Sequence, residues 1–163
     1  MLQHLLREES IRIGLEAPDR RHALEQMLQL IPGNALNPSE RERLLEMLLQ
    51  RENFGTTAIG DGIAMPHCSF SSVSFPLAAF GISRHGIEYA SLDGEPVHFV
   101  FLAVFPEVGD IVALKRQILF PVESILRDRF LQGRLFSCDE PHDAYEILMR
   151  EVQTGLSLLR AAQ

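Results

Sequence analysis

The sequence is poor in the features of secreted and membrane proteins. It has two cysteines in 163 residues, Cys68 and Cys138, which are too few and too isolated for a disulfide framework. No apolar run approaches the roughly 18 residues of a membrane-spanning helix. Charged side chains interrupt residues 1–10, so they do not form the apolar core of a signal peptide. We therefore expect a cytoplasmic protein that inserts no segment into a membrane.

The sequence also lacks the marks of nucleic-acid-binding and metal-binding proteins. The formal net charge is −7 and no run of lysine and arginine occurs, which argues against a nucleic acid as partner. No C-x-x-C or H-x-x-x-H spacing is present to ligate a metal. There is no internal repeat, low-complexity tract or linker. We expect no metal and no cofactor, and partners that are basic or neutral.

What is present is an ordinary globular composition, 46% hydrophobic and 23% charged. A chain of this length buries roughly 68–70% of its unfolded surface, which is enough for a core without disulfides or metals. We expect a single domain over residues 1–163. Its core should span about 5–153, with a C-terminal tail or short helix at 154–163.

Hydrophobic periodicity predicts strands that alternate with helices. Expected strands cover residues 11–15, two short stretches on either side of the Gly60–Gly62 turn, 77–82, 87–90 and 97–105. Expected helices cover residues 19–31, 38–51, 111–129 and 141–153, with a short separate segment at 134–136. Pro121 should kink or end the third helix near Phe120, and Gly155 should stop the last. The expected class is therefore α/β, a single-domain sandwich with a mixed β-sheet and helices on both faces.

A stiff backbone step presents one histidine, His67, at the end of a predicted strand. Proline fixes its own φ at about −65° and pushes the residue before it towards extended geometry, so Met65-Pro66 constrains the backbone that leads into His67. Gly60-Asp61-Gly62 is a tight-turn signature just upstream. A histidine held in one orientation suits a nucleophile. A lone histidine in an apolar stretch is also commonly a buried one with its hydrogen bonds satisfied, and the residues alone leave both interpretations open.

Other chemistries fit the spacing poorly. The G-D-G turn lacks the third glycine and the following helix of a dinucleotide-binding fingerprint. His67 and Cys68 are adjacent, so on extended backbone they point to opposite faces and do not form a metal pair. A hydrolase or metal enzyme using His67, His98 and Asp61 has no supporting spacing. His98 lies in the apolar strand 97–105 and is either a buried, hydrogen-bonded histidine or a residue that lines the site.

One segment is similar to a known active site. Residues 51–70 read R-E-N-F-G-T-T-A-I-G-D-G-I-A-M-P-H-C-S-F. This stretch resembles the fructose/mannitol-type (type 2) enzyme IIA domains of the bacterial phosphoenolpyruvate-dependent phosphotransferase system, and most of all the nitrogen-regulatory branch. The pieces that carry the resemblance are Arg51-Glu52, Gly55-Thr56-Thr57, residues 59–64 and Pro66-His67. The resemblance implies the enzyme IIA fold, with His67 accepting a phosphoryl group from the phosphocarrier protein HPr.

The residue types suit this chemistry. Neutral imidazole is a good nucleophile near neutral pH because its unperturbed pKa is about 6.5. Phosphoryl transfer asks the protein mainly for positioning and charge stabilisation, and a guanidinium fork can hold the phosphoryl oxygens. Arg51 corresponds to the family's arginine. On a helix it shares the apolar face of Leu44 and Leu48, so it either snorkels or points into a site; the resemblance favours the phosphate role.

The chain departs from the family at two positions. Members usually carry a second histidine on the long helix, but no histidine occurs between His98 and His142, and a rough match puts Lys115 near that place. Lys115 either snorkels or points in. Pointing in, it would stabilise a phosphoryl group and disfavour protonation of His67, but it could not accept a hydrogen bond. Cys68 stands where the family usually has glycine, and we expect a buried, inert thiol.

The expected function is a phosphoryl carrier of the phosphotransferase system in a regulatory role of the nitrogen-regulatory type. His67 is the phosphorylated nucleophile, and Arg51 and Lys115 hold the phosphoryl oxygens. HPr is the expected donor, and a regulated transporter or kinase, or a separate enzyme IIB, is the expected acceptor. The alternative is a regulatory binding module with the same fold, in which phosphorylation is only a switch or is lost.

Overall fold

The apolar run that starts at Val97 forms the central strand of a mixed sheet, β6 (Val97–Phe105). Every residue of β6 except His98 is buried. Its alternate residues lie in two separate apolar clusters, one on each face of the sheet: Phe99, Phe101 and Phe105 in the first, and Val100, Leu102 and Val104 in the second. A strand covered on both faces is apolar throughout, and the prediction for this segment is confirmed.

Within residues 2–161, whose backbone the computed structural model describes together with the side chains of residues 2 and 4–155, the sheet has five further strands. They are β1 (Ile11–Ile13), β2 (Ala58–Gly60), β3 (Ile63–Ala64), β4 (His67–Ser69) and β5 (Leu77–Ile87). The order is β1-β5-β6-β3-β2, and β4 also pairs with β6. β5 is antiparallel to β6, while β3 and β4 are parallel to it and β1 is parallel to β5. β2 and β3 are the expected antiparallel pair around the Gly60–Gly62 turn.

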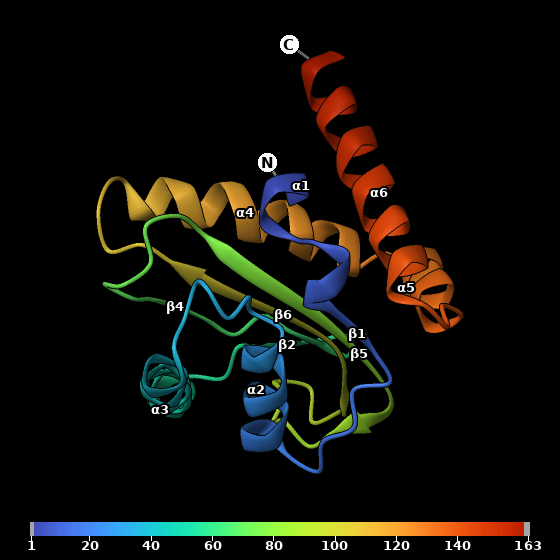
Figure 1. Ribbon diagram of the computed structural model, residues 1–163. Coiled ribbons are helices and arrows are strands. Elements are labelled where there is room, and N and C mark those ends of the chain that lie inside the picture. Colours follow the sequence, from blue (N-terminus) through green and yellow to red (C-terminus); the bar gives the residue numbers. More distant parts are fainter. Residues whose placement is uncertain (1, 162–163) are drawn as a thin grey trace.

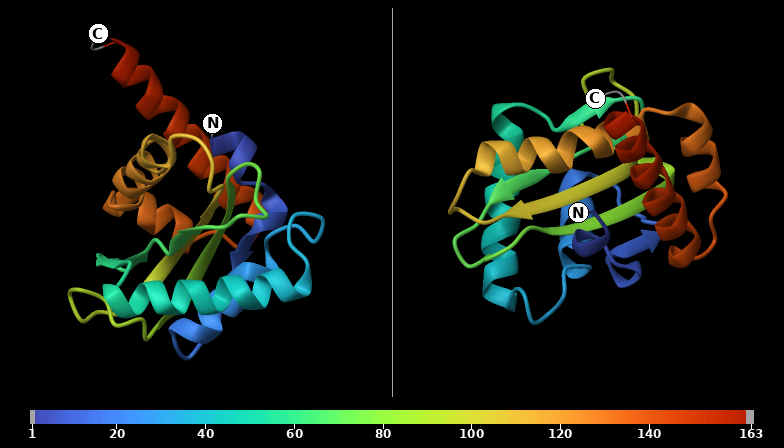
Figure 2. Two further views of the ribbon diagram at one scale, coloured as in Figure 1. Left: turned by 90° about the vertical axis from the view of Figure 1, so that its left-hand side faces the viewer. Right: turned by 90° about the horizontal axis from the view of Figure 1, so that it is seen from above.

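Helices cover both faces of the sheet (Figures 1 and 2). One face packs against α2 (Arg20–Gln29) and α3 (Pro38–Phe54), and the other against α4 (Ile111–Leu126), α5 (Arg129–Phe136) and α6 (Pro141–Ala161). A short α1 (Leu2–Leu5) and a 3-10 turn, η1 (Glu8–Ser10), lie beside α6. The predicted α/β sandwich, with a mixed sheet and helices on both faces, is confirmed. Across residues 2–161, no helix has both the length and the apolar character needed to cross a membrane.

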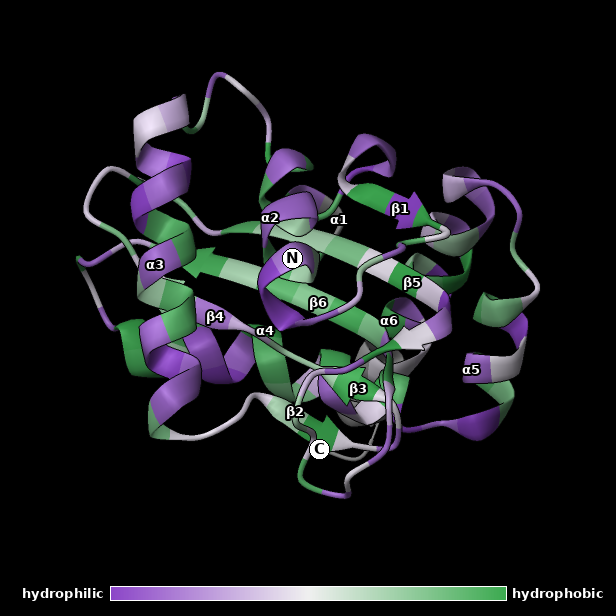
Figure 3. Cartoon of the chain, turned by 90° about the horizontal axis from the view of Figure 1, so that it is seen from below, coloured by the Kyte–Doolittle hydropathy of each residue, from purple (hydrophilic) through white to green (hydrophobic). Residues whose placement is uncertain are grey.

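The helix that leads into the 51–70 segment begins at residue 38, as predicted. Asn37 and Glu40 form a capping box: the Asn37 side chain accepts from the Glu40 N–H, and the Glu40 carboxylate accepts from the Asn37 N–H, each at 2.9 Å. Pro38 occupies the first turn, where no N–H is needed. α3 then turns an apolar stripe towards the sheet and a polar one outward (Figure 3).

The predicted break at residues 83–86 and the separate strand at 87–90 are wrong, because β5 continues without interruption to Ile87. The register of its pairing with β6 shifts between Ile82 and Ile87. Gly86 has φ +85°, which a residue with a side chain rarely adopts. The irregularity takes up the extra residues of β5 within one continuous strand.

The helix expected over residues 111–129 is α4, which ends at Leu126, and the separate segment expected at 134–136 is the end of α5. α4 continues through Pro121 to Leu126, so it does not end near Phe120. A proline removes one main-chain hydrogen bond, and the buried side chains of Val122 and Leu126 hold the second half of the helix on the core. The Asp128 carboxylate then accepts from two N–H groups of the next turn, at 2.8 and 3.0 Å, and this cap starts α5.

The prediction that Gly155 stops the last helix is also wrong, since the backbone of α6 remains helical to Ala161 and projects beyond the sheet (Figure 1). A glycine inside a helix costs only about 1 kcal/mol relative to alanine, and a glycine that ends a helix typically does so in the left-handed conformation. Gly155 does not have a positive φ. Of the predicted tail, residues 162–163 lie outside the described part of the chain.

Candidate functional site

Main-chain hydrogen bonds hold His67 at the sheet. It is the first residue of β4 and pairs with Ala103 of β6. The Pro66 carbonyl accepts from the Ala103 N–H at 3.0 Å, and the Met65 N–H donates to the Thr57 carbonyl at 3.0 Å. Met65, Pro66 and Thr57 are all buried. His67 follows the stiff Met65-Pro66 step as predicted, but it begins strand β4 and does not stand at the end of a strand.

The imidazole of His67 is oriented by its own backbone. Nδ1 lies 2.9 Å from the Met65 carbonyl oxygen, which can only accept, so Nδ1 carries a proton. In the neutral ring, Nε2 then holds the free lone pair. The ring is half-buried and meets the Phe105 ring edge-on, with centroids 6.4 Å apart. His67 therefore has a fixed tautomer and one available nucleophilic nitrogen.

The surroundings favour the neutral form of this ring. Burial is the largest cause that lowers the pKa of His67, and the positive charges of Lys115 and Arg51 lower it further. The hydrogen bond to the Met65 carbonyl and the negative charge of Glu52 act in the opposite direction. Because the net effect is a lowered pKa, His67 is unprotonated near neutral pH, as a nucleophile must be.

Arg51 lies in the last turn of α3 with an exposed side chain. Its Nη1 donates to the Gly55 carbonyl at 2.8 Å, so the guanidinium is fixed to the turn between α3 and β2. Its charge is near enough to lower the pKa of His67, although it makes no described hydrogen bond to that ring.

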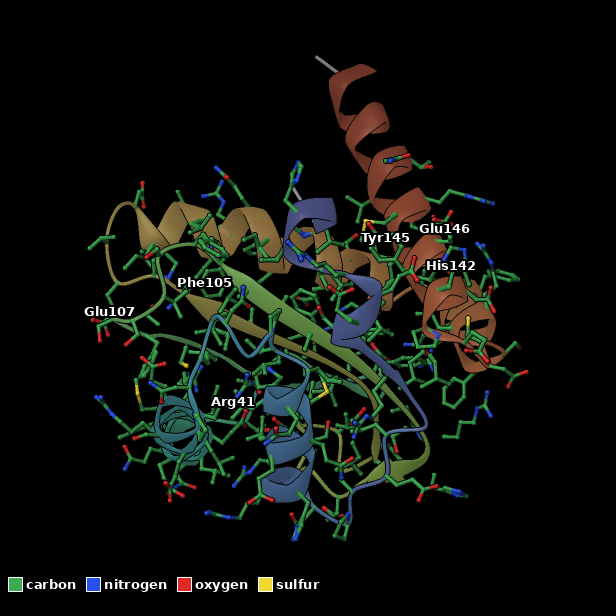
Figure 4. All side chains as sticks on the ribbon, in the orientation of Figure 1. Arg41, Phe105, Glu107, His142, Tyr145 and Glu146 are labelled. Carbon is green, nitrogen blue, oxygen red and sulfur yellow. The ribbon has the colours of Figure 1, made fainter. Side chains whose placement is uncertain are left out.

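Lys115 lies on α4 and is half-buried. Its Nζ is 5.7 Å from the centroid of the Phe105 ring, the same ring that His67 contacts. Phe105 stands at the end of β6 beside α4, with Glu107 just beyond it (Figure 4). Of the two placements expected for Lys115, snorkelling or pointing in, the structure shows the second, because Nζ lies on the Phe105 ring that His67 also contacts. The charge of Lys115 lowers the pKa of His67 more than the charge of Arg51 does.

Behind the site lies a buried carboxylate whose placement the sequence reasoning missed. Glu52 is 4% exposed and accepts from both the N–H (2.8 Å) and the hydroxyl of Thr57. The Tyr89 hydroxyl donates to it at 3.3 Å, and Arg20 Nη1 lies 3.9 Å away. Burial is the main reason that the pKa of Tyr89 is well above its ordinary value. A signal was present: Glu52 follows Leu48 by four residues and so falls on the apolar face of α3.

Cys68 is half-buried, not fully buried as expected, and its thiol is inert. Burial raises the pKa of its thiol to about 12, while the charge of Lys115 lowers it and that of Glu107 raises it. A thiol with so high a pKa has almost no thiolate at neutral pH and is a poor nucleophile. Nothing in the structure explains why cysteine stands here.

The structure does not bring His98 and Asp61 to His67. His98 lies at the opposite end of β6 with Nδ1 2.8 Å from the Ser83 carbonyl, so it is the hydrogen-bonded histidine of the two alternatives. Asp61 pairs instead with Arg127 at 2.6 Å and Arg129 at 2.9 Å. Among the residues that the structure describes, no three His, Cys, Asp or Glu side chains are grouped to hold a metal ion.

Residues 4–151 match the model of one protein family, the "Phosphoenolpyruvate-dependent sugar phosphotransferase system, EIIA 2". The chain belongs to this family. Membership confirms the predicted resemblance to type 2 enzyme IIA domains, and the match covers the whole 51–70 segment.

The type 2 enzyme IIA chain covers nearly the whole of one relative and a small part of another. It is 30% identical over 144 residues to a nitrogen regulatory protein of Bradyrhizobium diazoefficiens, across 88% of this chain and 92% of that protein. It is 35% identical over 135 residues to the fructose-specific EIIABC component of Bacillus subtilis, across 81% of this chain. The chain spans only 21% of that larger relative.

Solved structures share the fold. The nitrogen regulatory protein IIA-Ntr from Neisseria meningitidis superposes with a TM-score of 0.80 at 22% identity, covering 90% of this chain and 98% of that one. Enzyme IIA mannitol from Escherichia coli, solved in complex with phosphorylated enzyme IIB mannitol, superposes with a TM-score of 0.69 at 18% identity. The superposition covers 88% of this chain and 96% of that one.

Proposed function

We propose that this type 2 enzyme IIA chain is a cytoplasmic phosphoryl carrier with a regulatory role, and that His67 accepts the phosphoryl group from HPr. The observation that carries the proposal is the presentation of His67. Its Nδ1 is held by the Met65 carbonyl, its Nε2 lone pair is free, and its lowered pKa keeps the ring neutral. A neutral, oriented imidazole is what phosphoryl transfer between histidines requires.

The step balances without any co-reactant. Nε2 of His67 attacks the phosphorus of the donor phosphohistidine, and a new N–P bond forms as the donor's N–P bond breaks. The electron pair of the broken bond stays on the donor imidazole. The proton on Nδ1 of His67 stays on that nitrogen, hydrogen-bonded to the Met65 carbonyl throughout, so the ring bears the positive charge that develops during attack.

Two cations are assigned to the phosphoryl oxygens. Lys115 and Arg51 come from different helices, and the charge of each acts on His67. In the proposal they neutralise part of the negative charge of the transferring group. Lys115 takes the role for which the family usually has a histidine, with the difference that it supplies a permanent charge and no acceptor.

The proposed acceptor is a partner protein. The mannitol enzyme IIA of Escherichia coli forms a complex with phosphorylated enzyme IIB, which supports a separate enzyme IIB as one acceptor. A nitrogen regulatory protein of comparable length is a relative at 30% identity, which supports a regulated transporter or kinase as the other.

The proposal is tested by reconstitution. The protein is incubated with phosphoenolpyruvate, enzyme I and HPr, and intact mass is measured before and after acid treatment. We expect an acid-labile gain of one phosphoryl group that is lost in His67→Ala and kept in His85→Ala, because His85 is an exposed residue of β5 remote from the site. No gain in the natural protein, or an undiminished gain in His67→Ala, contradicts the proposal.

A second candidate is a regulatory binding module for which phosphorylation is only a charge switch or is absent. The observation that favours it is the relation to a nitrogen regulatory protein over 92% of that protein's length. Pull-downs from cell extract with His67→Ala and His67→Asp variants test it, because Asp carries a negative charge and Ala does not. A partner that binds the His67→Ala and His67→Asp variants differently supports a charge switch. A partner that binds both variants equally counts against the switch.

A further inference from the structure

We propose that Glu52 is a positioning residue for His67: its buried carboxylate fixes the Thr57–Met65 backbone contact that keeps Nδ1 of the His67 ring on the Met65 carbonyl and leaves the Nε2 lone pair for the reaction. The inference rests on the proposed function of His67. It assigns a role in the phosphoryl-transfer reaction to a side chain that does not itself reach the phosphoryl group.

The first support is the way in which Glu52 is bound. The side chain is 4% exposed, and a buried carboxylate is costly unless its oxygens are satisfied. Oε2 accepts the Thr57 N–H at 2.8 Å, and Oε1 accepts the hydroxyls of Thr57 and of Tyr89, the latter at 3.3 Å. Arg20, with Nη1 at 3.9 Å, supplies the compensating charge. A carboxylate held by so many donors is rigid, and so is the Thr57 backbone bound to it.

The second support is the continuous chain of contacts from Glu52 to His67. The carbonyl of Thr57 accepts the Met65 N–H at 3.0 Å, and the carbonyl of Met65 in turn accepts Nδ1–H of His67 at 2.9 Å. The turn that carries Thr57 is also tied by Arg51, whose Nη1 donates to the Gly55 carbonyl. Glu52 and Arg51 are neighbours on α3 and brace the same turn, Glu52 from the buried side and Arg51 from the exposed side.

The third support is the sign of the charge. When Nε2 attacks phosphorus, positive charge develops on the imidazole, and a nearby carboxylate stabilises it. Of the charged groups that act on His67, Lys115 and Arg51 are positive and Glu52 is negative. Glu52 is therefore the group that favours the cationic ring, while the two cations favour the phosphoryl oxygens.

The experiment compares Glu52→Gln with Glu46→Gln. Glutamine keeps the size of the side chain but removes the charge, and its NH₂ group cannot accept the hydrogen bonds that a carboxylate oxygen can. Glu46 is the matched control, because it lies on the same helix and pairs with Arg21 on the surface at 2.7 Å. The ring nitrogens of His67 are followed by nitrogen-15 NMR across a pH titration, which reports the tautomer and the pKa without any phosphorylation.

We expect Glu52→Gln to leave His67 as a mixture of tautomers with a lower pKa, and to slow phosphorylation by HPr about tenfold, the lower end of the roughly 10–100-fold loss typical when a partner that orients a metal-ligating histidine is removed. Glu46→Gln should match the natural protein in all three measurements. A folded Glu52→Gln protein with the natural tautomer and pKa overturns the inference, even if its phosphorylation is slower.

If Glu52→Gln does not fold, Thr57→Val replaces it, because valine removes the hydroxyl donor to Glu52 while the main-chain N–H remains. In Thr57→Val, the tautomer mixture of His67 should shift in the direction expected for Glu52→Gln, but by less. An unchanged tautomer in Thr57→Val overturns the inference. The NMR readout separates this inference from the proposed function. Failure of the natural protein to be phosphorylated contradicts only the latter.

Discussion

Replacing Lys115 by methionine tests the electrostatic part of the site most directly. Methionine preserves a flexible apolar stem beside Phe105 and removes the charge. His67 and Lys115 Nζ lie 6.4 and 5.7 Å from the centroid of the same Phe105 ring, so Nζ is within about 12 Å of the imidazole. At that distance a pair of unit charges interacts by about 0.3 kcal/mol in water and about 1.4 kcal/mol at an effective dielectric constant of about 20.

A phosphoryl group carries close to twice the unit charge, so the loss of Lys115 should cost about 0.7–2.8 kcal/mol of phosphoryl binding. The corresponding change in the exchange equilibrium with HPr is about 3-fold to 100-fold, and we expect about tenfold for this half-buried site. The assay mixes the protein with phospho-HPr and measures the phosphorylated fraction of each partner by intact mass at equilibrium.

The pH dependence of the Lys115→Met variant has a predictable direction. The positive charge of Lys115 lowers the pKa of His67, so its removal raises that pKa. The acid-side decline of the phosphorylation rate, where His67 becomes protonated, should therefore move to higher pH. Arg116→Met is the control, because Arg116 is exposed on the same helix. An equilibrium within twofold of the natural protein, with an unshifted pH profile, would refute the role given to Lys115.

Three further predictions concern stability, each measured by chemical denaturation. Asp61 adopts φ +55° and pairs with two arginines. Asparagine tolerates that backbone, so Asp61→Asn should lower the free energy of unfolding only by the two exposed ion pairs, about 0.2–1 kcal/mol each. Alanine does not tolerate it, so Asp61→Ala should lower the free energy of unfolding by about 1 kcal/mol more. Glu8 raises the pKa of His142 through a 2.8 Å hydrogen bond, so this pair stabilises the fold below the ordinary histidine pKa and loses its effect as pH rises through the raised pKa. Glu8→Gln should therefore destabilise at about pH 5.5 and be neutral at about pH 8. Phe101, 1% exposed at the centre of β6, should cost about 3–5 kcal/mol when replaced by alanine, and a loss below about 1 kcal/mol would contradict its place in the core.

Local signals in the sequence determined most of the elements. The uninterrupted apolar run 97–105 became the doubly covered strand β6, and the Asn37–Glu40 capping box started α3 where it was expected. The two failures within helices share one cause. Pro121 and Gly155 lower local helix propensity by amounts that the rest of each helix overcomes.

The amino-acid sequence by itself also located the proposed site, because the Met65-Pro66 step and the motif around it are contiguous. Only the tertiary structure decided what surrounds His67. Phe105 and Lys115 reach it from distant parts of the chain, and Tyr89 meets Glu52 across 37 residues of sequence. The physical reason is that propensity, capping and turn chemistry act within a few residues, whereas the tautomer and charge of a buried ring depend on groups that strand pairing and helix packing bring together.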